Sequence, residues 1–443
     1  MAKDMTEGKP LKVILFFAIP VFIGNVFQLM YNMVDTIIVG RILGEDALAA
    51  VGSIGPLMGL ILGLAIGLAQ GFGVMISQAY GARDGKLLKH YIALSFFLML
   101  IISAGLTIIT LAGMNQFLVW MNIPENVFKL TADYTRIVFV GIIASMAYNV
   151  AAAILRGIGD SKTPLYFLIF SSILNLILDV WFIVGLSMST AGAALATVIS
   201  QGVSALMCLI YMFYKYELVR FEKKDFYLDG KSIYRLLSVG IPMALSYSIT
   251  ATGTVILQSA INSFGSCVVA AYTAAFKVTS VSSQTMAALG TSMSTYCAQN
   301  VGARKTERIF SGMKTAFYLT CFTAALASLI HIFCGRAIVG LFVSNPTEEL
   351  YSYAMEYMRI NSWFMLPLAL IYTYRNALQG MGEGFMPMFS GFVEMVSRYV
   401  ATMLLIGPFG YTGLCFANPA AYTTAAIVLV ITYGCWKRKN QCK

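Results

Sequence analysis

Long apolar runs separated by short polar segments make up almost the whole sequence. A window of about 20 apolar residues, the length of a helix that crosses a hydrocarbon core, predicts twelve membrane spans in the chain. The expected spans cover 12–39, 47–78, 90–112, 127–154, 164–186, 190–214, 234–262, 267–298, 311–334, 350–378, 386–407 and 413–436. Several exceed one bilayer crossing, so we expect them to tilt or kink. The pattern predicts an all-α integral membrane protein.

Four short motifs occur twice along the chain. The pairs are IP at 19–20 and 241–242, SQAYGARD and AQNVGARK at 77–84 and 298–305, DYTRI and EYMRI at 133–137 and 356–360, and LRGIGDSKTP and LQGMGEGFMP at 155–164 and 378–387. Their offsets are 222, 221, 223 and 223 residues. Such a constant offset indicates an internal duplication.

Each repeat holds six of the expected spans, an even number, so both halves have the same orientation in the membrane. Such parallel repeats are related by an axis along the membrane normal, and this architecture is typical of transporters. We predict an N-lobe at 1–214, a charged cytoplasmic linker at 215–233 and a C-lobe at 234–443.

Composition agrees with a membrane protein, because 58% of the residues are hydrophobic and 11% are charged, against about 25% charged residues in soluble domains. The net charge of +10 comes from basic residues in loops between apolar runs, so we expect no nucleic-acid partner. Eight cysteines without C-x-x-C spacing and two separated histidines predict no metal site. The N-terminus shows no cleaved signal peptide pattern.

The distribution of Lys and Arg predicts the orientation. The two ends and the loops after even-numbered spans, with their flanks, hold 23 of these residues, Arg375 among them. The other side holds three: Arg41, Lys129 and Arg336. By the positive-inside rule, we expect a multi-pass protein of the plasma (cytoplasmic) membrane with both termini in the cytoplasm.

Two acidic residues inside apolar spans are the main candidates for chemistry. Asp35 ends a polar stripe in the first span, whose other members are Gln28, Tyr31 and Asn32. The helical spacing puts the stripe on one face. An ionised carboxylate in hydrocarbon costs several kcal/mol. The stripe should therefore face the protein interior or water, and Gln28, Tyr31 and Asn32 are also candidates for the lining of a substrate cavity.

The fifth span carries Asp179, with Asn175 one turn earlier. A rise of 1.5 Å per residue places Asp35, Asp179, Thr197 and Tyr134 roughly 8–12 Å from the outer ends of their spans. Four helices thus bring polar side chains to one level of the N-lobe. Two nearby carboxylates in a dry site can bind a proton, and with the oxygens of Asn175 and Thr197 they can equally bind Na⁺. The sequence leaves H⁺ and Na⁺ open as the coupling ion, and predicts no other cofactor.

The second repeat lacks these acids. Asp179 corresponds to Thr402, Asn175 to Arg398, and Asp35 falls near Leu257, whereas Tyr134 corresponds to Tyr357. The C-lobe has its own charges in Glu394 and Arg398, one turn apart, which form either a local ion pair that braces the bundle or part of a substrate or gating site. Lys277 is a further charge inside a span, with no assigned role.

The repeated IP, SQAYGARD and AQNVGARK, LRGIGDSKTP and the run NLILD resemble the multidrug and toxic compound extrusion (MATE) transporters, over nearly the whole chain. The resemblance implies a secondary active antiporter with rocker-switch alternation between two lobes, in which entry of H⁺ or Na⁺ drives export of small amphipathic, often cationic compounds. It implies that Asp35, Asn175, Asp179, Thr197 and Tyr134 form the cation-coupling site of the N-lobe. We expect a single protomer in the lipid bilayer to suffice.

The sequence departs from the family in one respect. Some sodium-driven members carry a glutamate in the seventh span after the proline, where this chain has Ser246, Ser248 and Thr250. That difference favours coupling in the N-lobe.

Two alternatives have less support. A lipid-linked oligosaccharide flippase of the same superfamily would need clustered cations for pyrophosphate, whereas Arg136, Lys277, Arg359 and Arg398 are scattered along the chain. An intramembrane enzyme would need a nucleophile or metal motif at helical spacing, and the sequence has none.

Overall fold

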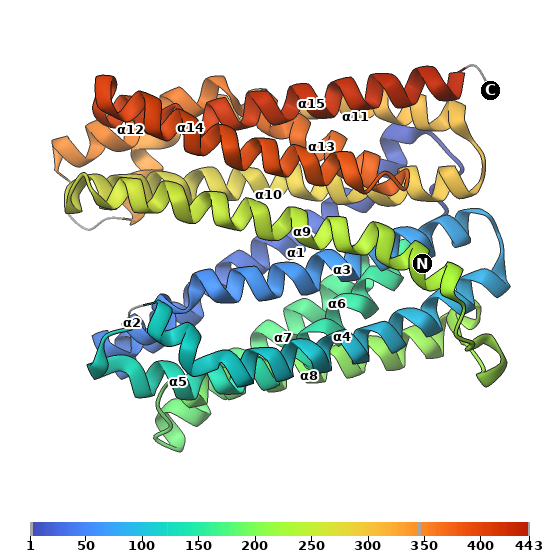
Figure 1. Cartoon of the computed structure of the whole chain (residues 1–443), viewed down its shortest axis with the longest axis horizontal. Helices are drawn as coiled ribbons and strands as arrows, with labels where there is room; N and C mark the ends of the chain where they lie inside the picture. The colour runs from blue at the N-terminus through green and yellow to red at the C-terminus, as the bar shows by residue number, and fades with distance from the viewer. Residues whose placement is uncertain (1–2, 122, 343–346, 442–443) are drawn as a thin grey trace. The chain divides into compact units, whose positions relative to one another are not determined.

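The computed structural model describes residues 3–121, 123–342 and 347–441. In these ranges all regular elements are helices, so the predicted all-α fold is confirmed. The first half contains α1 (Pro10–Ile38), α2 (Glu45–Ser53), α3 (Gly55–Gly81), α4 (Gly85–Trp120), α5 (Glu125–Val140), α6 (Ile142–Gly157), α7 (Lys162–Val180) and α8 (Thr190–Lys215). The second half contains α9 (Gly230–Asn262), α10 (Ser266–Gly302), α11 (Thr306–Phe342), α12 (Glu348–Trp363), α13 (Met365–Gly380), α14 (Phe385–Cys415) and α15 (Ala417–Gln441) (Figure 1).

Each of the twelve expected spans corresponds to one of these helices or to a broken pair of them. Within the described ranges, nine helices are long and apolar enough to cross a membrane, or ten if α5 and α6, bent by 43°, are one span. The two spans that fail this test are α10 and the pair α12–α13. Both carry many hydroxyl and amide side chains, which line a cavity described below.

The backbone repeats along with the sequence. Three pairs of residues, separated by 221 or 223 positions, share a left-handed backbone: Gly44 and Gly265 (φ 87° and 90°), Arg83 and Arg304 (both 56°), and Gly159 and Gly382 (92° and 90°). Positive φ is uncommon for residues other than glycine. The same conformation at Arg83 and Arg304 therefore confirms that the two halves are structural repeats.

Contacts divide the described chain into two compact units. Two of the three boundaries fall inside helices, one in α1 and one in α9, and the third lies between Asp4 and Met5. Unit 1 contains Ile23–Ala244 together with Lys3 and Asp4, and unit 2 contains Met5–Phe22 and 245–441. The first part of α1 thus belongs with the second repeat, and the first part of α9 with the first. These units are defined by contacts, whereas the lobes predicted from the sequence follow the repeat, so the lobe boundaries stay a prediction.

Close helix packing explains the place of α9 in unit 1. A Cβ atom on Gly67 of α3 would lie 2.4 Å from Cα of Ala244, and one on Gly71 would lie 2.3 Å from Cα of Gly240. Small residues four positions apart let two membrane helices approach this closely. In unit 2, the start of α1 joins the apolar core, and the Ser292 hydroxyl donates to the carbonyl of Ile14 at 3.0 Å.

Candidate functional site

The predicted acidic residues of unit 1 meet inside the helix bundle. Asp179 on α7 is fully buried, and Asn175, one turn earlier, is 1% exposed. Asp35 on α1 is half-buried, and its carboxyl group lies within hydrogen-bonding reach of Asp179. Two carboxyl groups can share a hydrogen bond only when one of them carries a proton. The pair is therefore suited to bind a proton.

Polar neighbours from two further helices complete this group. Tyr31 on α1 shares a hydrogen bond with Thr197 on α8, and Tyr134 on α5 lies close enough to interact electrostatically with both carboxyl groups. The Asn175 amide is best satisfied with its nitrogen toward Asp179, where it donates to Oδ2 at 2.8 Å and its oxygen accepts from the Thr197 N–H at 3.1 Å. We call Tyr31, Asp35, Tyr134, Asn175, Asp179 and Thr197 the acidic cluster.

The structure places two other predicted residues differently. Gln28 and Asn32, also on α1, have exposed side chains, unlike Tyr31 and Asp35 of the same stripe. Their role in a substrate cavity stays a prediction, as does the coupling role of the cluster itself.

A distorted helix segment follows each carboxylate, which the sequence did not indicate. A π-helix at Val39–Leu43 continues α1 just after Asp35, and another at Trp181–Gly185 continues α7 just after Asp179. Single π-turns inside α-helices are rare and often occur at functional sites. Val39 and Ile183 from these two segments pack in one apolar core, and Tyr134 of the acidic cluster packs against that core.

The cluster offers oxygen atoms to a small cation. One oxygen of each carboxyl group, Oδ1 of Asp35 and Oδ1 of Asp179, is buried without a hydrogen-bond partner among the described residues. A buried polar atom left unpaired costs free energy. A proton or a hard cation such as Na⁺ would satisfy both oxygens, and the amide and hydroxyl oxygens nearby suit either ion.

The second charged group lies in unit 2 and contains an arginine whose buried partner the sequence did not indicate. Glu394 and Arg398 on α14 form the expected ion pair, with Nη2 and Oε1 3.0 Å apart. The other carboxylate oxygen of Glu394 accepts from Nη2 of Arg375 at 2.8 Å. From the sequence, Arg375 was counted with the flank of a cytoplasmic loop, at the end of a predicted span. It lies within α13, and its side chain is 13% exposed.

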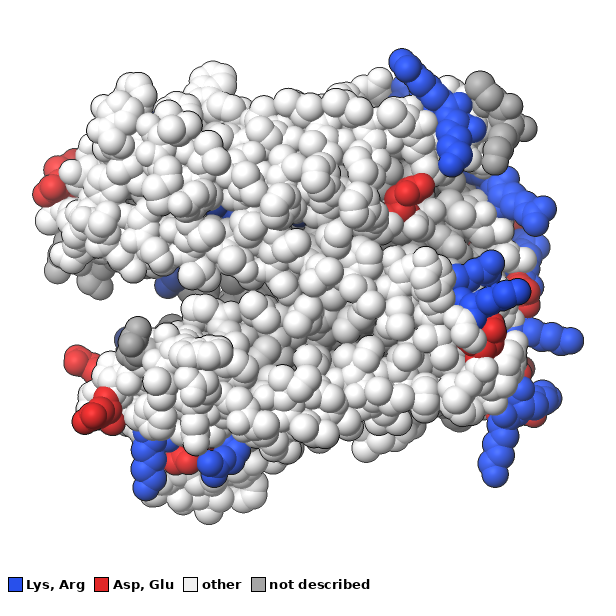
Figure 2. Space-filling model, in the orientation of Figure 1, with Lys and Arg blue, Asp and Glu red and all other residues white. Residues whose placement is uncertain are grey.

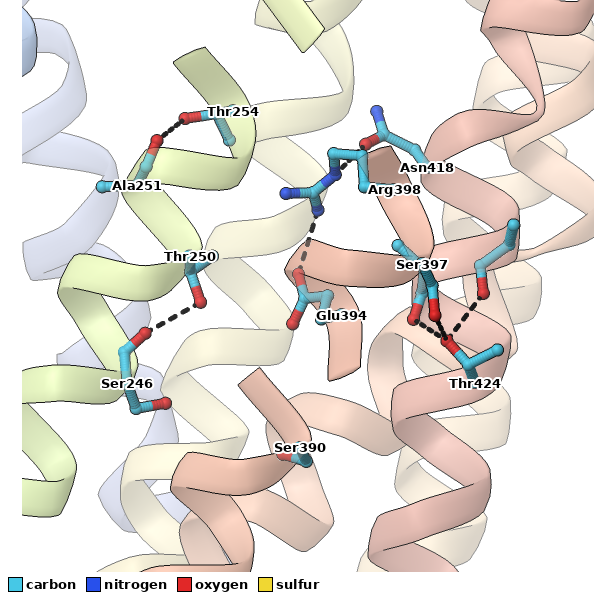
Figure 3. A network of polar contacts seen from close by, with 12 residues as sticks. Ser246, Thr250, Ala251, Thr254, Ser390, Glu394, Ser397, Arg398, Asn418 and Thr424 are labelled. Carbon is cyan, nitrogen blue, oxygen red and sulfur yellow. Dashed lines mark hydrogen bonds and ion pairs between the residues drawn. The ribbon is translucent and has the colours of Figure 1, made fainter. Parts of the chain in front are cut away.

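Further hydrogen bonds fix this network. Nε of Arg398 donates to Oδ1 of Asn418 on α15 at 3.0 Å (Figure 3). The Asn418 amide donates to the Tyr357 hydroxyl at 3.3 Å. The Thr402 hydroxyl donates to the carbonyl of Arg398 at 2.7 Å. We call Tyr357, Arg375, Glu394, Arg398 and Asn418 the arginine cluster.

A cavity of about 350 Å³ opens beside the arginine cluster. Hydroxyl-bearing residues of α9 and α10, among them Thr250, Thr254 and Thr279, form much of its wall. Phe276, Met365 and Leu368 add apolar surface. The volume lies in the range of pockets for small organic molecules, so unit 2 contains its own candidate binding cavity.

The sequence matches a known family twice. The family model MatE matches residues 20–181 and again 242–404, two segments whose starts are 222 residues apart. The chain belongs to the MatE family. The resemblance stated from the motifs is thereby confirmed, and the two matches coincide with the two repeats.

Relatives and solved structures agree over the full length. The chain is 28% identical over 439 residues to "Probable multidrug resistance protein YpnP" of Bacillus subtilis (strain 168), with 98% of each chain covered. It is 23% identical to "Multidrug export protein MepA" of Staphylococcus haemolyticus (strain JCSC1435), covering 97% of this chain and 94% of MepA. A structure entitled "Outward-facing conformation of a multidrug resistance MATE family transporter of the MOP superfamily" has a TM-score of 0.91 and 25% identity, covering 99% of this chain and 98% of that one. The protein is therefore a MATE-family membrane transporter.

Proposed function

We propose that the protein exports small amphipathic organic compounds in exchange for H⁺ or Na⁺, with the acidic cluster as the ion-coupling site. The close approach of the Asp35 and Asp179 carboxyl groups carries this proposal, since each has one buried oxygen without a partner among the described residues. A group that binds and releases a cation during transport must be buried in one state and must still be able to exchange its ion. The half-buried carboxyl group of Asp35, next to the fully buried one of Asp179, suits this requirement.

In the proposed cycle, an arriving cation or proton occupies the unpaired oxygens of the two carboxyl groups. Loss of that ion leaves two charges facing each other in a site of low dielectric, which is unfavourable. The repulsion would separate Asp35 on α1 from Asp179 on α7. The π-helices beside both residues are the places where these helices can change their winding, and we propose that this movement drives rocker-switch alternation between the lobes.

The proposed cargo follows from the relatives and from the cavity. Several relatives are named multidrug resistance or export proteins. Aromatic residues such as Phe276 and Tyr372 in the cavity of unit 2 suit an organic cation, since aromatic faces attract positive charge. We propose that a single protomer performs the exchange.

Surface charge supports a cytoplasmic position of both termini in the plasma membrane. On the face drawn in Figure 2, Lys and Arg side chains of unit 2 gather where α15 ends. In unit 1 most of them lie at the end where α3 is connected to α4, with few near α5. Arg375, which lies within α13, is one of the 23 cationic residues counted on the cytoplasmic side, and the asymmetry holds without it.

Transport by the purified protein tests the proposal. Proteoliposomes loaded with a cationic dye should release it when a pH or sodium gradient is imposed, and the gradient that drives release identifies the ion. Asp179→Asn should abolish the gradient-driven release, while Asp133→Asn, which changes an acid of α5 outside the cluster, should keep it. Unchanged release with Asp179→Asn would refute coupling at this cluster, and release that responds to neither gradient would refute antiport.

A further inference from the structure

The two charged clusters occupy equivalent positions in the two repeats. Asn175 corresponds to Arg398 and Tyr134 to Tyr357 at an offset of 223, and Thr197 corresponds to Asn418 at an offset of 221. Asp179 corresponds to Thr402, which hydrogen-bonds the backbone of Arg398. The same place in the fold thus holds two carboxyl groups in unit 1 and a buried guanidinium in unit 2.

The charge at the cavity of unit 2 is positive. Its charged lining residues are Arg375, Glu394 and Arg398, two guanidinium groups against one carboxylate. Glu394 is 4% exposed, and each of its carboxylate oxygens accepts a hydrogen bond from one of the arginines. A carboxylate engaged in this way is already neutralised, so it is a poor site for an additional cation.

One hydrogen-bond donor of Arg398 is unpaired among the described residues. The residue is 2% exposed, with Nε bound to Asn418 and Nη2 bound to Glu394, but Nη1 is buried without a hydrogen-bond partner among the described residues. Nη1 points at Gly253 on α9, where a Cβ atom would lie 2.4 Å away. Thr250 and Thr254, on either side of Gly253 along the helix, line the cavity (Figure 3).

We propose that the cavity of unit 2 binds the anionic group, a carboxylate, of an organic compound, and that Nη1 of Arg398 donates to it. Arginine donors fit carboxylates in geometry and charge, and a guanidinium without a full set of acceptors gains most from such a partner. The apolar wall of Phe276, Met365 and Leu368 would contact the body of the compound, and the threonine hydroxyls would hold its remaining polar atoms.

For its role in transport, this inference rests on the proposed export function. It narrows the preferred cargo from organic cations in general to those that also carry a carboxylate. Binding itself can be measured without transport. A failure of carboxylate recognition would leave ion-coupled export intact, and a failure of coupling in proteoliposomes would leave the binding result standing.

Rhodamine B and its ethyl ester are suitable probes, because the two dyes differ in whether a carboxylate is present while the cationic ring system stays the same. Fluorescence anisotropy with the purified full chain in detergent gives both affinities. We expect rhodamine B to bind about tenfold more tightly than the ester, the size of one charge-assisted hydrogen bond. Equal affinities, or tighter binding of the ester, would overturn the proposal.

Three variants locate the effect. Arg398→Gln should remove the preference for rhodamine B, whereas Arg336→Gln, which alters an exposed arginine of α11 that pairs with Glu348, should retain it. Glu394→Gln should strengthen binding of rhodamine B, since it removes the carboxylate that competes for the guanidinium groups. A preference that survives in Arg398→Gln, or binding weakened by Glu394→Gln, would contradict carboxylate recognition at this site.

Competition separates an organic carboxylate from a free inorganic anion. Benzoate should displace rhodamine B, while equal concentrations of chloride or phosphate should not. Displacement by phosphate or chloride as strong as that by benzoate would overturn the organic part of the proposal. If Arg398→Gln does not fold, the result with Glu394→Gln and this competition decide the question on the intact protein.

Discussion

Nη2 of Arg375 on α13 lies 2.8 Å from Oε2 of Glu394 on α14, and both side chains are almost fully buried. This contact makes Glu394 the shared partner of two arginines rather than half of a local pair on one helix. The second repeat therefore contains a fixed ionic network inside its helix bundle, at the equivalent place in the repeat to the two closely spaced carboxyl groups of the first.

Removing Arg375 should destabilise the protein strongly. Arg375→Met leaves Oε2 of Glu394 buried without its donor. The free energy of unfolding should fall by about 2–4 kcal/mol, because breaking a buried ion pair by removing one partner leaves a desolvated charge. Chemical unfolding of the purified protein in mixed micelles measures the change.

Arg336→Met is the matched control for that experiment. Arg336 pairs with Glu348, but the two side chains are 59% and 81% exposed. Its loss should cost less than about 1 kcal/mol, as is usual for exposed pairs. Similar losses in both variants would mean that burial does not strengthen the Arg375–Glu394 contact.

The close approach of α3 and α9 should not tolerate a methyl group. Gly67→Ala would place Cβ 2.4 Å from the backbone of Ala244, and neither backbone can move without unpacking the helices. We expect little folded protein in fluorescence-detected size-exclusion chromatography. Gly59→Ala, in the same helix with no atom within 4 Å of the new Cβ, should fold normally. A normal elution profile for Gly67→Ala would contradict the packing.

Much of the fold could be predicted from the sequence because apolar run length and repeated motifs are local signals. The acidic cluster could also be anticipated, since Asp35, Asp179, Thr197 and Tyr134 were found at one depth by counting residues. What counting could not supply was the direction in which each side chain points. Gln28 and Asn32 share a stripe with Asp35 by spacing, yet their side chains are exposed.

Arg375 shows why the arginine cluster was missed. Arg375 lies inside the predicted span 350–378 and was counted with the flank of the loop that follows, but Glu394 supplies its partner from the next helix. When the partner of a charged residue lies on another helix, the spacing of residues along the sequence does not reveal it. The π-helices after Asp35 and Asp179 have no local sequence signal either, since they arise from packing between helices.

The glycine-rich turn LRGIGDSKTP should depend on Asp160. Its carboxylate accepts from the backbone N–H groups of Lys162 and Thr163 at 3.1 Å and from the Tyr216 hydroxyl at 2.7 Å. Asp160→Ala should lower the free energy of unfolding by about 2 kcal/mol, because it leaves several buried donors unpaired. Glu383→Ala, at the equivalent position of the second repeat but exposed, should have little effect. Equal effects would show that the turn does not rely on this carboxylate.

Gly253→Ala should disturb the arginine cluster without changing any charge. Its Cβ would lie 2.4 Å from Nη1 of Arg398, and the guanidinium cannot swing away freely because Asn418 and Glu394 hold its other nitrogens. Rearrangement of a tightly packed site by one added methyl group typically costs about 1–3 kcal/mol, and chemical unfolding should register that loss.

Two comparisons show whether this loss comes from the Arg398 contact. Gly407→Ala, on α14 with open space at its Cβ, should leave stability unchanged. Adding Arg398→Lys to Gly253→Ala should recover part of the loss, since the lysine ammonium lacks the nitrogen that meets the new methyl group. Arg398→Lys by itself also destabilises the protein, because it removes the two guanidinium nitrogens that donate to Asn418 and Glu394. The double variant should therefore be more stable than the sum of the two single losses predicts. Strictly additive losses would mean that Gly253 and Arg398 are not in contact. The unpaired Nη1 donor of Arg398 would then have to lie elsewhere.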